Sequence, residues 1–143
     1  MAHESIFYGL IDAGEKKGRG ELIHAHNRCI IESLPDTSSE LISRQMFAFV
    51  EPPVAFRTQL IHFARSINYI EDCWPQFLNE FEGLIGRMCW YYVRLHISFD
   101  QYGGEYAYTW SPDEVGQADL FADPPRPISS WEFSGGPREF PIV

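Results

Sequence analysis

Residues 74–110 decide the fold of this chain and have the sequence WPQFLNEFEGLIGRMCWYYVRLHISFDQYGGEYAYTW. In their first part, apolar residues recur every three or four positions, which is the spacing of one face of a helix. These residues are Trp74, Phe77, Leu78, Phe81, Leu84, Ile85 and Met88. Asp72 is a suitable N-cap, and Pro75 suits the first turn. The spacing therefore predicts an amphipathic helix over about residues 74–88.

A β-hairpin is predicted directly after this helix. Residues 90–100 are rich in aromatic and β-branched side chains, and residues 102–105, Tyr-Gly-Gly-Glu, are typical of a turn. Because side chains alternate along a strand, three aromatic residues of the returning strand share one face: Tyr106, Tyr108 and Trp110. Apolar and polar residues also alternate on the outgoing strand, so we expect one buried face and one partly wet face.

A second, shorter helix is predicted over about residues 112–121. Ser111 suits its N-cap, and Pro112 suits its first position. Asp113 and Glu114 then place negative charge near the positive end of the helix dipole.

The rest of the chain favours strands, which are expected over residues 6–12, 21–26, 28–33, 45–51, 56–67 and 131–133. The segment 45–51 has apolar residues on both faces, which predicts a central strand. The segment 56–67 also fits a helix, because Leu60, Ala64 and Ile67 fall at helical spacing.

These elements predict a single α+β domain over residues 1–143. Its mostly antiparallel sheet is expected to pack on the main helix at about 74–88, with the second short helix at about 112–121. The sequence Gly-Gly-Pro at 135–137 predicts a flexible C-terminal tail from about residue 135.

The charge of the chain is negative, with a formal net charge of −9 at pH 7. The excess is concentrated in residues 99–143, where only Arg126 and Arg138 oppose the acids Asp100, Glu105, Asp113, Glu114, Asp119, Asp123, Glu132 and Glu139. This balance argues against binding to nucleic acid or to an anionic membrane, since both require Lys and Arg. An acidic surface can simply keep a protein soluble, but it also attracts a basic partner over long range.

The cysteines, the first eight residues and the length of the apolar runs together predict a cytoplasmic protein. Cys29, Cys73 and Cys89 cannot all pair with one another, and none lies in a C-x-x-C motif, which favours reduced thiols. Residues 1–8 lack the basic cluster of a secretory signal. No run approaches the roughly 18 apolar residues of a membrane span.

Catalytic signatures are absent from the sequence. His24 and His26 would share one face of a strand over 21–26, and zinc binds such a pair when a third ligand converges. Third ligands could come from His62, His96, Asp100 or Cys89. The simpler interpretation is that His24 and His26 are two surface or half-buried histidines.

Four features resemble the small immunity proteins of bacterial polymorphic toxin systems. They are the single acidic domain, the main helix leading directly into the hairpin VRLHISFDQYGGEYAYTW (Val93–Trp110), the Ser-Pro-Asp-Glu helix start at 111–114, and the lack of a catalytic signature. The resemblance covers about residues 72–122. It implies a protein that binds a cognate toxin domain tightly and blocks its active site or its access to substrate.

We therefore expect a non-enzymatic, acidic binding protein without a cofactor, which neutralises a basic partner enzyme such as a toxin domain. The residues predicted to bind the partner are the acids and rings of the last third: Asp100, Tyr102, Glu105, Tyr106, Tyr108, Trp110, Asp113 and Glu114. Two alternatives stay open: a small metal-dependent enzyme that uses His24 and His26, and an assembly subunit of a phage or a secretion system.

Overall fold

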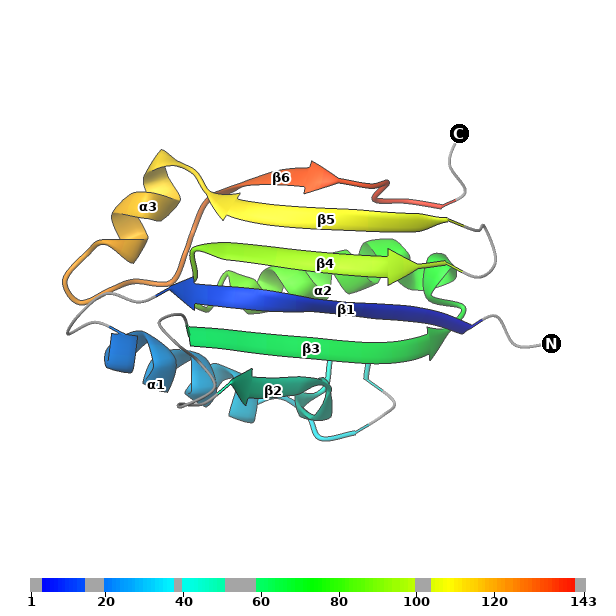
Figure 1. Ribbon diagram of the computed structural model, residues 1–143, viewed down its shortest axis with the longest axis horizontal. Helices are drawn as coiled ribbons and strands as arrows, with labels where there is room; N and C mark the ends of the chain where they lie inside the picture. The colour runs from blue at the N-terminus through cyan, green and yellow to red at the C-terminus, as the bar shows by residue number, and fades with distance from the viewer. Residues whose placement is uncertain (1–3, 15–19, 38–39, 51–58, 100–103, 141–143) are drawn as a thin grey trace.

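The structure, a computed structural model, describes residues 4–14, 20–37, 40–50, 59–99 and 104–140 (Figure 1). In this part of the chain six strands form one sheet, in the order β2-β3-β1-β4-β5-β6, and all neighbours are antiparallel. The strands are β1 (Glu4–Gly14), β2 (Phe47–Val50), β3 (Gln59–Asn68), β4 (Tyr92–Ser98), β5 (Glu105–Pro112) and β6 (Trp131–Gly135). The helices are α1 (Gly20–Glu32), α2 (Trp74–Ile85) and α3 (Glu114–Leu120), with 3-10 turns at Arg44–Met46 and Ile70–Cys73. The predicted α+β domain with an antiparallel sheet is confirmed. No helix in the described residues combines the length and the apolar character that crossing a bilayer requires.

Helix α2 packs on one face of the sheet, as the sequence predicted, behind β4 and β1 in Figure 1. Its aromatic side chains belong to the buried core. The ring centroids of Phe77 and Phe7 are 4.9 Å apart, and those of Phe81 and Trp110 are 5.2 Å apart. All four side chains are fully buried. Because burial of one such side chain is worth about 1.5–3 kcal/mol, this layer of rings holds the helix firmly on the sheet.

Strand β1 lies between β3 and β4 and carries a glycine that the packing requires. A Cβ atom at Gly9 would lie 2.0 Å from the carbonyl oxygen of Arg94 and 2.7 Å from the ring of Phe63. A side chain at position 9 would therefore push Phe63 off the sheet or separate β1 from β4.

Residues 20–32 form helix α1, so the strands predicted over 21–26 and 28–33 are wrong. The buried side chains Ile23, Asn27 and Ile31 are spaced four residues apart, and one of them is polar. Asn27 donates to the carbonyl oxygen of Cys89 at 2.8 Å and accepts from the Cys89 amide at 2.9 Å. This pair of bonds fastens α1 beside the turn that follows α2.

Strand β2 is an edge strand, so the central position predicted for 45–51 is also wrong. Its apolar residues on the inner face are covered by α1, where the ring of His24 lies 5.6 Å from that of Phe49. Strand β3 confirms the strand predicted over 56–67 and excludes the helical alternative for its residues 59–67; residues 56–58 and Glu51 lie outside the described residues.

Helix α3 begins two residues later than its sequence predicted. Strand β5 continues through Pro112, and Asp113 rather than Ser111 is the N-cap. The carboxylate of Asp113 accepts a hydrogen bond from the amide of Gly116 at 3.0 Å. At α2 the predicted cap, Asp72, lies instead inside the 3-10 turn that leads into the helix.

The segment after β6 packs on the core, although the sequence predicted a flexible tail from about residue 135. The carbonyl oxygen of Pro137 accepts hydrogen bonds from Trp74 Nε1 at 3.0 Å and from the Tyr108 hydroxyl at 2.6 Å. The guanidinium of Arg138 pairs with Glu82 on α2. These contacts hold the chain against the edge of the core beyond the last strand.

Candidate protein-binding surface

The sheet has one covered face and one open face. Helices α1 and α2 pack on the covered face. Figure 1 is viewed from the open face: α2 lies behind the strands, and none of the described helices lies in front of them. On the open face two large apolar side chains of β1 are exposed, Ile6 at 53% and Tyr8 at 55%. Half-buried Leu10 follows Tyr8 on the same face of β1, and half-buried Leu60 on β3 lies further along this face, opposite Asp12. An apolar surface at the centre of an uncovered sheet is a feature of interaction sites.

The middle of this open face is a row of four residues from four adjacent strands. The register places Tyr8 between Ala64 and His96, and His96 between Tyr8 and Ala107. The rings of Tyr8 and His96 are stacked, with centroids 5.3 Å apart and planes 9° apart. Because the outer neighbours are exposed alanines, they leave the far sides of the two rings accessible.

The charge of the open face is negative among the described residues. Its acidic side chains are Glu4, Asp12, Glu105 and Glu132, at outward positions of β1, β5 and β6. In the described strands one arginine, Arg94, is at an outward position, and its guanidinium lies 5.7 Å from the ring centre of Tyr92. The apolar centre therefore has a predominantly acidic surround.

Two aromatic residues predicted to bind a partner are core residues instead. Tyr108 and Trp110 have no exposed surface, because they lie on the face of β5 that is turned toward α2. The hydroxyl of Tyr108 donates to Pro137, and Trp110 Nε1 donates to Glu82 at 2.9 Å. Burial raises the pKa of Tyr108 to about 12. Their polar atoms, which suggested a half-wet position, are satisfied inside the protein.

The other predicted rings and acids of the hairpin are separated from one another. Tyr106 is half-buried on the inner face, with its ring centroid 5.6 Å from that of Phe99. Glu105 is exposed and lies on the open face, opposite Ser98. Glu114 is exposed on α3. Two further predicted residues, Asp100 and Tyr102, lie outside the described residues.

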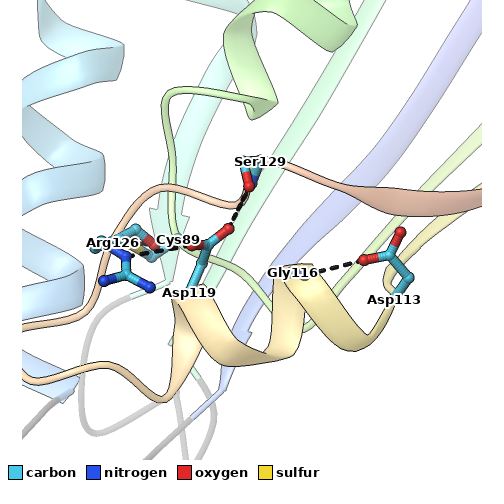
Figure 2. Close-up of polar contacts among 6 residues, drawn as sticks. All are labelled: Cys89, Asp113, Gly116, Asp119, Arg126 and Ser129. Atoms are coloured by element: carbon cyan, nitrogen blue, oxygen red, sulfur yellow. Dashed lines mark hydrogen bonds and ion pairs between the residues drawn. The ribbon is translucent and has the colours of Figure 1, made fainter.

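The acids around α3 are largely engaged in local structure (Figure 2). Asp113 caps α3, and the hydroxyl of Ser130 also donates to it, which holds the pKa of this carboxyl below its usual value. Asp119 was not predicted as a structural residue. It accepts from the hydroxyl of Ser129 at 2.5 Å and from Arg126 Nε at 3.3 Å, and the Ser129 hydroxyl is the main cause of its lowered pKa. Both carboxylates fasten the segment between α3 and β6.

His24 and His26 do not share a face, because residues two apart on a helix point in nearly opposite directions. His26 Nε2 lies 2.7 Å from the carbonyl oxygen of Arg87, while His24 contacts Phe49. In the described part of the chain, no three His, Cys, Asp or Glu side chains are grouped closely enough to hold a metal ion. The strand-face pair behind the metal alternative is therefore wrong.

The exposed residues of β1 were missed by sequence reasoning. The run Ile6-Phe7-Tyr8-Gly9-Leu10-Ile11 has large apolar residues on both faces, so its pattern identifies a strand but not which side is covered. His96 was expected on a partly wet face, and the structure places it there. Its stacking with Tyr8 depends on the pairing of β1 with β4, which local sequence does not specify.

Comparison with protein-family models, with curated proteins and with solved structures gives no match. The function is therefore inferred from the chemistry of the open sheet face.

Proposed function

We propose that this protein binds a basic protein partner through the open face of its sheet, as an inhibitor of the immunity-protein kind. The observation that carries this proposal is the exposure of Ile6 and Tyr8 on a sheet face that no described helix covers, with acidic residues around them. Exposed apolar side chains gain free energy when a partner removes them from water. The acidic surroundings select which partner can approach.

The charge of the molecule favours a basic protein over other partners. Its net charge is −9, and among the described residues of the open face four are acidic and one, Arg94, is basic. Nucleic acid phosphates would be repelled by this face, and so would the same face of a second copy of the chain. A cationic protein would be attracted at long range and would associate faster at low salt.

The open face is suited to tight binding because it is already formed. Its side chains project from paired strands of one sheet, so little backbone freedom is lost when a partner docks. Tyr8 and Ile6 then act as anchors at the centre, and the carboxylates pair with lysine or arginine side chains at the rim. A bound partner enzyme would have its basic substrate-binding surface covered.

Affinity capture with matched variants tests this proposal. The immobilised full chain is exposed to lysate of its native host, and a retained protein is identified, purified and titrated by calorimetry. The face variant Tyr8→Ser/Glu105→Lys is compared with the control variant Asn79→Ser/Glu80→Lys, whose changes lie on the exposed side of α2. We expect a basic protein, an unchanged Kd for the control, and a Kd raised at least about tenfold for the face variant.

If the partner is an enzyme, the wild-type protein is expected to abolish its activity at equal concentration. Equal binding by the wild type and both variants would contradict the proposed surface. Retention of an acidic protein or of nucleic acid would contradict the proposed partner.

A further inference from the structure

The open face contains one shallow cleft with an unusual combination of lining groups. Its volume is about 30 Å³, and it is lined by Tyr8, His96, Ile97, Ser98 and Glu105. The space suffices for about one or two water molecules, so a bulky side chain cannot enter it. A larger ligand group can therefore only lie over the cleft, against the rings and the carboxylate at its rim.

The lining groups come from three adjacent strands and are held by the register of the sheet. Glu105 on β5 pairs with Ser98 on β4, and His96 on β4 pairs with Tyr8 on β1. The stacked rings thus lie one row along the strands from a hydroxyl and an exposed carboxylate. Aromatic rings beside a carboxylate are the surroundings in which a guanidinium binds well.

We propose that this cleft binds an arginine side chain of the basic partner, whose guanidinium stacks on the Tyr8–His96 pair and bonds to Glu105. This inference rests on the proposed function and names the group that the partner presents. A guanidinium is planar and offers several N–H donors, so it can contact a ring and a carboxylate at once. The hydroxyl of Ser98 provides a further acceptor.

Other ligand groups suit the cleft less well. A phosphate or a carboxylate would meet the negative charge of Glu105. An apolar side chain would cover Glu105 and Ser98 without giving them hydrogen bonds, which is costly. A nucleobase could stack on the rings, but its phosphates would lie against the acids of the open face.

Chemical-shift titration of the full chain tests the arginine site directly. The ¹⁵N-labelled protein is titrated with N-acetyl-arginine amide, with the lysine analogue, and with the uncharged isostere N-acetyl-citrulline amide. Arginine amide is expected to shift signals of residues 8, 96–98 and 105, with the lysine compound binding about threefold more weakly and citrulline amide not binding.

Variants separate this site from a general attraction of cations. Tyr8→Phe is expected to keep the binding of arginine amide, whereas Tyr8→Leu and Glu105→Gln are expected to lose it. Glu114→Gln is the control, because Glu114 is an exposed acid on α3 away from the cleft. The same spectra show whether each variant is folded.

Three results would overturn the proposal. They are shifts spread over all exposed acids, arginine binding that survives Tyr8→Leu, and stronger binding of a single-stranded RNA oligonucleotide at the same residues. If arginine amide fails to bind but the face variant still loses the basic partner, only the arginine site is refuted. If arginine amide binds here while the face variant captures the partner normally, the cleft binds a guanidinium but the proposed surface is refuted, and with it the use of this cleft by the partner.

Discussion

Substitution of Asn27 by alanine is expected to destabilise the fold strongly, although Asn27 is a polar residue on a surface helix. Its side chain is 1% exposed and satisfies both backbone groups of Cys89. Alanine would remove both hydrogen bonds that Asn27 makes to the backbone of Cys89. It would also release α1 from the turn that follows α2.

The size of the effect follows from these two backbone groups. Each hydrogen bond lost is worth about 0.5–1.5 kcal/mol, so the loss in the free energy of unfolding is about 1–3 kcal/mol. With a urea m-value of about 2 kcal/mol/M, a loss of about 2 kcal/mol lowers the unfolding midpoint by about 1 M.

Urea unfolding followed by tryptophan fluorescence and by far-UV circular dichroism measures this shift. Asn79→Ala is the matched control, because Asn79 is an exposed asparagine on α2 and its loss is expected to change stability by less than about 0.5 kcal/mol. If Asn27→Ala were as stable as this control, the placement of α1 against residue 89 would be refuted.

Three further predictions concern substitutions of single residues. The pKa of Asp119 is lowered in the folded state, so its ionised carboxylate stabilises the fold above the unfolded pKa of about 3.9, and this contribution is lost as the pH falls below that value. The difference in unfolding free energy between the wild type and Asp119→Ala should therefore be large at pH 7 and should shrink by pH 3. The pKa of Tyr108 is raised from 10.0 to about 12, so the unfolded state holds fewer protons between these values. Stability is expected to fall as the pH rises through this range, and Tyr108→Phe should reduce that fall; an unchanged pH dependence would contradict the burial of the phenol. Gly9→Ala is expected to unfold the protein or leave it insoluble, because its Cβ would lie 2.0 Å from a backbone oxygen. Gly83→Ala is the control: its Cβ would meet no atom within 4 Å, and it is expected to raise stability by about 1 kcal/mol. Thermal melting compares the two variants, and similar melting temperatures would refute the packing at β1.

The parts of the fold that sequence could predict are those with an unbroken period. The stripe from Trp74 to Met88 contains only apolar residues, and the hairpin of β4 and β5 alternates cleanly, so both were predicted correctly. Helix α1 was missed because its buried stripe includes Asn27, whose partner lies 62 residues away. A polar residue at that position weakens the helical period, and nothing local indicates that it is buried.

The candidate site was predicted less well, because it depends on which face of the sheet the helices cover. Aromatic residues with polar atoms looked suited to an interface, but Tyr108 and Trp110 bond to groups that are distant in sequence. Of the predicted residues that the structure describes, Glu105 lies on the open face. Tyr8 joins it only through the pairing of β1 with β4.

The anchoring of residues 137 and 138 has a consequence for folding during synthesis. The indole of Trp74 and the carboxylate of Glu82, both on α2, find partners in Pro137 and Arg138, more than fifty residues later. A nascent chain that has reached only α3 already has the bonds of Tyr108 and Trp110 to Trp74 and Glu82, but it lacks those of residues 137 and 138. Such an intermediate is expected to stay incompletely packed, and to be accessible to chaperones, until β6 and residues 137 and 138 have been synthesised.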